Sequence, residues 1–247
     1  MPLPLPRWIA HRGGGALAPE NTLAGIRLAA RLGFTAVEFD VMLSQDGTPV
    51  LIHDETLERT TSVCGRVADT PDAVLFSLDA GGGEHIPSLA EAAALCRQYG
   101  LLANVEIKPA TGYEVLTGEV VAREVAVLWR DAPTPPLLSS FSHEALEVAR
   151  QVAPALPRGL LYEKVPDDWQ TTFQRLGAYS LHCRADRLSN EVLALAREGQ
   201  VPVLAYTVND SLAAQLLFGR GVASLFTDRL DLFAPETSLY KSLHLGG

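Results

Sequence analysis

Cysteine is scarce in this sequence, and its placement excludes two classes of protein. The three cysteines, Cys64, Cys96 and Cys183, are widely spaced and form no Cys-x-x-Cys pair. An odd, scattered set does not suit a disulfide framework, and it makes a thiolate zinc site improbable. We therefore expect a reduced, cytoplasmic protein.

Basic residues and long apolar runs are also in short supply. Lys and Arg number 20 against 29 Asp and Glu, which gives a net charge of −9 and no basic stripe for nucleic acid. No apolar run approaches the roughly 20 residues of a membrane span. The first residues lack the charged and apolar regions of a secretory signal. We expect neither nucleic-acid binding nor stable membrane insertion.

What the sequence has is a regular alternation of strand-like and helix-like segments. Hydrophobic residues make up 47% of the 247, enough for a sizeable core. The expected strands are 7–11, 37–42, 101–107, 136–140, 158–162, 180–183, 201–206 and 222–226. Eight strand–helix units in this length predict one α/β domain over 1–247, a (β/α)8 TIM barrel. A doubly wound parallel sheet is the alternative.

One segment and two helix starts stand out from this alternation. Residues 55–87 are rich in Thr, Asp, Gly and Pro, and their apolar residues keep neither the period of a strand nor that of a helix. We therefore expect a small irregular insertion after the second strand. Asn21 is expected to cap the next helix, which stops at Gly33. Ser88 and Glu91 have the spacing of a capping box.

The stretch 36–54 carries the first chemistry. Its apolar and polar residues alternate with the period of a strand, so Glu38 and Asp40 point to the same face. Neighbouring carboxylates repel each other unless a cation or a proton lies between them. After an Asp-Gly turn, a second apolar run ends on His53. This pattern favours a metal site with an acid or base beside it, and a solvated strand face with an incidental histidine is the alternative.

Titratable side chains gather where the predicted strands end, which is where barrel enzymes bind their ligands. Glu38, Asp40 and Glu106 are expected to converge from neighbouring strands on one divalent cation. An all-oxygen ligand set suits Mg²⁺ or Ca²⁺ and not zinc. His11 and His53 flank this cluster and can exchange protons near neutral pH.

Two cations complete the set. Arg12 and Lys108 are enough to bind one phosphate group. Two imidazoles, one metal and two cations predict the hydrolysis of a phosphodiester. The metal would neutralise the phosphoryl oxygens, while one imidazole activates the nucleophile and the other protonates the leaving alkoxide.

Ordinary structural roles are the alternatives to these assignments. They are a buried core role for His11, salt bridges from Glu38 and Asp40 to Arg27 or Arg31, an ion pair between Glu106 and Lys108, and packing for Phe141 and Tyr206. His85 and His182 show no partner pattern, and we interpret both as structural.

These residues resemble the glycerophosphodiester phosphodiesterase family. The chain carries, in family order, the motifs HRG, PENT, ExD, HD, ExK, SF, TVN and TD, which begin at His11, Pro19, Glu38, His53, Glu106, Ser140, Thr207 and Thr227. The motifs span nearly the whole chain. The irregular segment 55–87 falls where the family carries a small insertion.

The resemblance implies a (β/α)8 barrel that hydrolyses small-molecule glycerophosphodiesters to an alcohol and sn-glycerol 3-phosphate. It implies a divalent cation on Glu38, Asp40 and Glu106. It gives His11 and His53 the general base and general acid roles.

The resemblance also implies a substrate-binding set. Arg12 and Lys108 would contact the phosphate, and Glu20 matches a family position from which it can orient Arg12. Phe141 and Tyr206 would contact the rest of the substrate. Tyr206 stands where the family usually has Trp, which keeps an aromatic wall and adds a hydroxyl.

Two other functions are alternatives. A lysophospholipase D or a phosphoinositide-phospholipase-C-like enzyme on the same barrel would need an apolar lip, for which Val74, Leu75 and Phe76 are the candidate. A non-catalytic barrel that binds an anionic metabolite would be favoured by a missing histidine or carboxylate, and none is missing. The sequence leaves open the headgroup, the choice of metal, the nucleophile and the oligomeric state.

Overall fold

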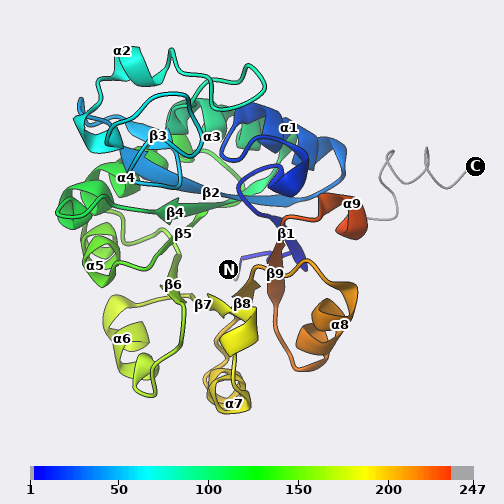
Figure 1. Ribbon diagram of the computed structural model, residues 1–247. Helices are drawn as coiled ribbons and strands as arrows, with labels where there is room; N and C mark the ends of the chain where they lie inside the picture. The colour runs from blue at the N-terminus through cyan, green and yellow to red at the C-terminus, as the bar shows by residue number, and fades with distance from the viewer. Residues whose placement is uncertain (1–2, 235–247) are drawn as a thin grey trace, which may run out of the picture.

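The computed structural model describes residues 3–234, and its strands close into a barrel (Figure 1). The parallel strands of this part are β1 (Trp8–Ala10), β2 (Ala36–Leu43), β4 (Leu102–Ile107), β5 (Leu137–Ser140), β6 (Arg158–Tyr162), β7 (Ser180–Arg184), β8 (Val203–Tyr206) and β9 (Ser224–Thr227). Strand β1 closes the ring because Trp8 pairs with Leu225 on one side and Ala10 with Val37 on the other. The predicted (β/α)8 barrel is confirmed. The doubly wound sheet is wrong because β1 pairs with the last strand, β9, as well as with β2, so the parallel strands form a closed ring without an edge.

One short strand is added outside the ring. Strand β3 (Pro49–Leu51) runs antiparallel to β2, with Val41 opposite Leu51. The turn between them bends at Gly47, whose positive φ of 81° suits glycine. Because β3 folds back along β2, it brings His53 to the end of the barrel where the β2 carboxylates lie.

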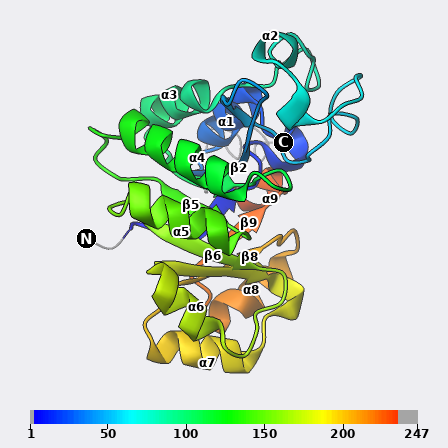
Figure 2. The same ribbon diagram turned by 90° about the vertical axis from the view of Figure 1, so that its left-hand side faces the viewer.

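Helices surround the strands on the outside. They are α1 (Leu23–Arg31), α3 (Leu89–Tyr99), α4 (Glu114–Leu128), α5 (His143–Val152), α6 (Trp169–Leu176), α7 (Asn190–Glu198), α8 (Ser211–Gly219) and α9 (Leu230–Phe233). In Figure 2, α3 to α7 follow one another down the side that faces the viewer. No helix within residues 3–234 has the length and apolar character needed to cross a bilayer.

Helix caps decide where two of these elements begin. The Ser88 hydroxyl accepts from the Glu91 backbone N–H, and the Glu91 carboxylate accepts from Ser88, so the predicted capping box is confirmed. The prediction for Asn21 is wrong, because Thr22 caps α1 by accepting from the Gly25 N–H. Asn21 instead has a left-handed backbone, with φ of 56°, and turns its side chain into the barrel.

The two faces of β2 explain how a polar site forms inside an apolar fold. Every residue of β2 is buried. Val37, Phe39 and Val41 pack outward in the cluster that α1 and α3 cover. Since side chains alternate along a strand, Glu38 and Asp40 are left facing the barrel interior.

The segment 55–87 has its own small core. It contains the short helix α2 (Asp72–Leu75) and the 3₁₀ turn Val67–Asp69, and Leu57 and Ile86 pack there with residues of β3. Leu75 is fully buried in this cluster, whereas Val74 is 41% exposed. Of the candidate lip at 74–76, Leu75 therefore belongs to the packing of the insertion, whereas Val74 lies at the surface.

Candidate active site

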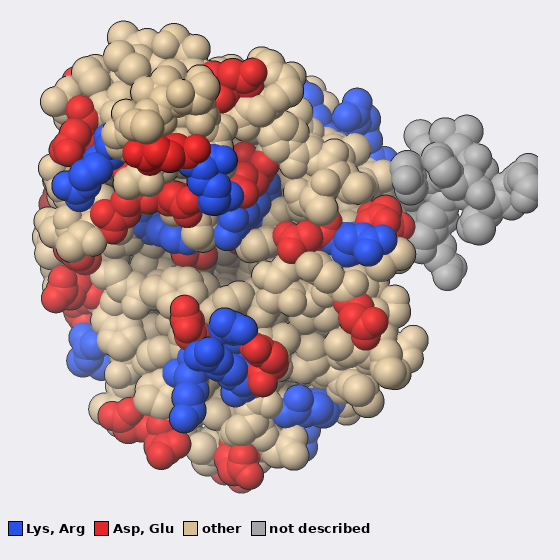
Figure 3. Space-filling view, viewed as in Figure 1, with Lys and Arg blue, Asp and Glu red and all other residues tan. Residues whose placement is uncertain are grey.

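A cavity of about 1030 Å³ opens at the carboxyl ends of the barrel strands. Figure 3 shows this hollow with charged side chains on both sides of it. Nine of the ten predicted site residues line it, namely His11, Arg12, Glu38, Asp40, His53, Glu106, Lys108, Phe141 and Tyr206. The tenth, Glu20, lies behind Arg12.

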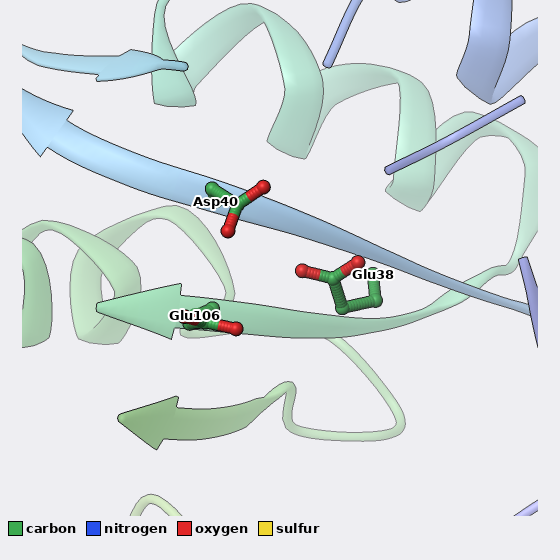
Figure 4. A group of neighbouring side chains, drawn as sticks. All are labelled: Glu38, Asp40 and Glu106. Atoms are coloured by element: carbon green, nitrogen blue, oxygen red, sulfur yellow. The ribbon is translucent and has the colours of Figure 1, made fainter. Parts of the chain in front are cut away.

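Three carboxylates meet at one side of the cavity. Glu38 and Asp40 come from β2, and Glu106 comes from β4, where it is the register partner of Asp40. One oxygen of each lies within 4.8 Å of the others, and all three residues are buried. Figure 4 shows the carboxylates turned toward one another from the two strands. The predicted convergence of these side chains is confirmed.

This grouping is electrostatically costly without a cation. Burial, followed by the charge of Asp40, raises the pKa of Glu38 to about 7. The same two causes raise the pKa of Glu106, whose buried Oε1 has no hydrogen-bond partner among residues 3–234. The oxygen ligands, their close spacing and this unpartnered atom fit a hard divalent ion such as Mg²⁺ or Ca²⁺.

Asp40 is the carboxylate whose ionised form is stabilised by nearby positive side chains. Lys108 Nζ lies 3.3 Å from Asp40 Oδ1 and 3.9 Å from Glu106 Oε1, while Arg12 Nε lies 3.7 Å from Asp40 Oδ2. Burial acts to raise the pKa of Asp40, but these charges outweigh it and lower that pKa. The alternative that the β2 carboxylates pair with Arg27 or Arg31 is wrong.

Asn21 and the loop after β1 hold the β2 carboxylates in place. Asn21 Nδ2 donates to Asp40 Oδ2 at 2.9 Å, and the Asp40 backbone N–H donates to Asn21 Oδ1 at 3.0 Å. The Arg12 backbone N–H donates to Glu38 Oε2 at 2.9 Å. Arg12 and Asn21 both adopt positive φ, and this places their polar groups toward β2.

His11 lies between two carboxylates. Its Nδ1 is 2.7 Å from Asp228 Oδ1, and its Nε2 is 3.9 Å from Glu38 Oε2. Burial acts to lower the pKa of His11, but the hydrogen bond to Asp228 and the charge of Glu38 raise it above the usual value. Asn209 Nδ2 holds Asp228 from behind at 3.0 Å.

His53 has a similar support on the other side of the cavity. Its Nδ1 is 2.5 Å from Asp54 Oδ1, and Arg59 Nε donates to the second oxygen of Asp54. Burial, together with the positive charge of Lys108, lowers the pKa of His53. Both predicted histidines therefore present Nδ1 to a carboxylate.

The predicted aromatic contacts lie at the ends of β5 and β8 and line the same cavity. Phe141 and Tyr206 meet edge to face, with ring centroids 6.1 Å apart. The Tyr206 hydroxyl, which has no counterpart in Trp, donates to the Tyr162 carbonyl at 2.9 Å. Phe141 is 42% exposed, so its ring is free for contact with a ligand.

The two histidines expected to be structural differ in where they lie. His85 pairs with Glu91 at 3.3 Å on the surface. His182 is fully buried at the floor of the cavity, 2.9 Å from the Ser180 hydroxyl. Burial lowers the pKa of its ring to about 3, so it is neutral.

Four supporting residues received no role in the site from the sequence. Asn21, Asp54 and Asp228 stand inside the motifs PENT, HD and TD, so the motifs marked their positions but not their partners. Arg59 lies in the irregular insertion, where no period indicates which side chain faces the site. Only the folded loop brings its guanidinium to Glu20 and Asp54.

Fold and site together define a class: a (β/α)8 barrel with a polar, acidic site at the carboxyl ends of its strands. The family model described as "Glycerophosphoryl diester phosphodiesterase family" matches residues 11–232. The chain belongs to this family, and the predicted resemblance and enzyme class, a phosphoric diester hydrolase, are confirmed. This favours an enzyme over the non-catalytic alternative.

The names of individual similar proteins agree with the description of the family. A glycerophosphodiester phosphodiesterase of Caldanaerobacter subterraneus is 34% identical over 228 residues, covering 89% of this chain and 93% of that protein. Human glycerophosphodiester phosphodiesterase 1 is 43% identical over a shorter stretch, 40% of this chain and 33% of that protein. An Oleispira antarctica phosphodiesterase, solved in complex with the product sn-glycerol-3-phosphate, matches with a TM-score of 0.86 and 37% identity, over 91% of this chain and 93% of that one.

Proposed function

We propose that this chain hydrolyses glycerophosphodiesters to an alcohol and sn-glycerol 3-phosphate, with a divalent cation. One observation carries the proposal: three buried carboxylates with oxygens within 4.8 Å of one another lie beside two histidines that each face a carboxylate. The names of the relatives support this substrate class, and the Oleispira protein binds the product that the reaction would release.

Glu38, Asp40 and Glu106 would hold the cation, Mg²⁺ or Ca²⁺, through carboxylate oxygens. When bound, the cation would neutralise charge on the phosphoryl oxygens. Arg12 and Lys108, which lie on either side of Asp40, would bind the phosphate. Their positive charges would then be shared between the carboxylates and the substrate.

His11 and His53 would move the protons. One takes a proton from the attacking oxygen, and the other gives a proton to the leaving alkoxide. Because Nδ1 of each ring faces Asp228 or Asp54, Nε2 is the atom left to exchange the proton. Phe141 and Tyr206, which line the cavity and contact each other, would contact the alcohol part of the substrate.

The test is release of sn-glycerol 3-phosphate from a panel of glycerophosphodiesters that differ in headgroup, with Mg²⁺, Ca²⁺ or a chelator. We expect turnover with at least one metal and none with the chelator. A phosphodiester without a glycerol moiety is the control for general phosphodiesterase activity. Absence of product from the whole panel with either metal would exclude the function.

A second substrate class is favoured by one observation on α8. Leu216 lines the cavity yet is 60% exposed, and Leu212, one turn earlier, is 65% exposed. An acyl chain could lie along this apolar edge, which would suit a lysophospholipid. Turnover of glycerophosphocholine against a long-chain lysophosphatidylcholine separates the two, and a strong preference for the lipid would make this the principal activity.

Three further expectations stay predictions. We propose one catalytic domain over 1–247, of which residues 1–2 and 235–247 lie outside the described residues. The cytoplasmic location rests on cysteine usage alone. The oligomeric state is open, and gel filtration with light scattering measures it.

A further inference from the structure

Arg59 comes from the irregular insertion and reaches the back of the active site. Its side chain is 46% exposed, and Arg59 is not among the residues that line the cavity. Nη1 donates to Glu20 Oε2 and Nη2 to Glu20 Oε1, both at 2.7 Å, which is a two-pronged contact. Its Nε donates to Asp54 Oδ2.

Both carboxylates that Arg59 binds are themselves bound to proposed site residues. Glu20 accepts from Arg12 Nη1 at 3.1 and 3.2 Å. Asp54 accepts from His53 Nδ1 at 2.5 Å. One guanidinium therefore links the residue proposed to bind phosphate to one of the residues proposed to move protons, and we call this chain of contacts the Arg59 bridge.

The loop that carries Arg59 is closed and anchored. The Leu57 N–H donates to the Gly65 carbonyl at 2.9 Å, and the Thr61 N–H donates to the Leu57 carbonyl at 3.0 Å. Leu57 itself is buried in the core of the insertion. Because these contacts hold the backbone on both sides of Arg59, they place its side chain within reach of Glu20 and Asp54.

The value of such a contact lies in geometry more than in energy. Exposed ion pairs typically contribute little to stability. A planar guanidinium with both prongs on one carboxylate and its Nε on another fixes two side chains in one orientation, which an ammonium cannot do. Groups that orient a catalytic side chain through its partner commonly change activity about 10- to 100-fold when removed.

We propose that Arg59 is a positioning residue: through Glu20 and Asp54 it sets the placement of Arg12 and His53 relative to each other. This gives the insertion a task in the reaction although Arg59 does not line the cavity. The proposal rests on the roles assigned above to Arg12 and His53.

The test compares three variants of the full chain with the metal that supports turnover. Arg59→Ala should lower kcat/KM for glycerophosphocholine by about 10- to 100-fold, with kcat falling through His53 and KM rising through Arg12. Arg59→Lys keeps the charge but not the fork, so it should not restore activity. Arg66→Ala is the matched control, because Arg66 lies in the same insertion and its ion pairs within residues 3–234 are with Glu55 and Asp69.

Activity of Arg59→Ala within twofold of wild type would overturn the proposal, as would full recovery in Arg59→Lys. A merely structural role would lower the melting temperature while kcat and KM per folded molecule stay unchanged. That result would also count against positioning.

A second readout does not depend on turnover. Long-range ¹H–¹⁵N correlation spectra at about pH 8 report which ring nitrogen of a neutral histidine carries the proton. In the wild type we expect His53, identified by its absence in His53→Gln, to be protonated on Nδ1, and in Arg59→Ala we expect the population to move toward Nε2. An unchanged tautomer would refute the link to His53. If the wild type hydrolyses no glycerophosphodiester, the proposed function fails while this measurement still decides the Arg59 bridge.

Discussion

His11 and His53 reach the cavity from opposite sides of the β2 carboxylates, yet their surroundings are alike. Each presents Nδ1 to a carboxylate, Asp228 or Asp54, at 2.7 or 2.5 Å. A carboxylate at Nδ1 fixes the ring orientation and the tautomer, so that Nε2 is available to the substrate. The sequence motifs predicted the imidazoles, and the structure adds the groups that orient them.

Replacing either histidine should therefore remove a proton-transfer step. We expect His11→Ala and His53→Ala each to lower kcat by about 10² to 10⁴, measured as sn-glycerol 3-phosphate release. His85→Ala is the matched control, since that ring pairs with Glu91 on the surface and does not line the cavity. Wild-type turnover in either active-site variant would refute the assigned role.

His182 gives a prediction about stability and pH. Its ring is buried, its Nδ1 has no hydrogen-bond partner in the described part of the chain, and its pKa is lowered to about 3 by burial. As pH falls below about 6.5, the unfolded chain takes up a proton at this residue and the folded chain does not. The free energy of unfolding should thus decrease as pH falls, by at most about 1.4 kcal/mol per pH unit.

The measurement is urea unfolding of the wild type and His182→Gln between about pH 6.5 and 5. Glutamine keeps a hydrogen-bonding group near Ser180 but does not titrate in this range. As pH falls, the free energy of unfolding of the wild type should decrease relative to that of His182→Gln. A constant difference would show that the buried ring does not govern this slope.

At the scale of elements, two neighbouring residues at the start of α1 have different roles. Thr22 supplies the cap, whereas Asn21 makes two hydrogen bonds to Asp40. Thr22→Ala should cost about 1 kcal/mol of stability and leave turnover near wild type. Glycine tolerates the positive φ at position 21, so Asn21→Gly tests the side chain alone. It should lower the free energy of unfolding by about 1 to 3 kcal/mol and also reduce activity, because buried groups of Asp40 lose their partners.

Urea unfolding and steady-state kinetics on both variants check this difference. Equal kinetics in the two would mean that Asn21 does not position Asp40. A larger loss of activity in Thr22→Ala would assign the role to the helix cap instead.

The elements also show what the sequence could and could not predict. The alternation of apolar and polar residues predicted that Glu38 and Asp40 point to the same face of their strand. The alternation of strands and helices along the chain predicted that the strand carrying Glu106 lies next to it. The spacing of Glu106 and Lys108 predicts that the two side chains lie side by side. In the structure, Lys108 Nζ lies nearer to Asp40, on the neighbouring strand β2, than to Glu106. That preference depends on register and side-chain reach, which no local pattern encodes.

Asn21 and Arg59 illustrate the same limit. A cap is a local signal, and Asn fits it, but here the loop after β1 turns Asn21 through a left-handed conformation toward β2. Arg59 lies in a segment without a period, and its partners are 39 and 5 positions away in sequence. Such contacts arise only once the insertion has packed against the barrel.

At the scale of the whole molecule, the acidic cluster couples cation binding to folding. The chain carries a net charge of −9 and buries three carboxylates within 4.8 Å of one another, so the folded state concentrates a repulsion that the unfolded chain spreads out. A cation that binds the folded state relieves this repulsion and stabilises the entire barrel.

We expect Mg²⁺ or Ca²⁺ at about 100 times its Kd to stabilise the chelator-treated protein by about 2.7 kcal/mol, seen as a rise in melting temperature. Glu106→Gln should reduce this rise, because it removes one charged ligand while keeping the size of the side chain. The same variant without metal should melt no lower than the wild type, because it removes a carboxyl whose ionisation is already disfavoured by burial and by Asp40. A metal-induced rise of equal size in wild type and Glu106→Gln would place the cation elsewhere, because a ligand acts on stability only through the contacts it makes in the folded state.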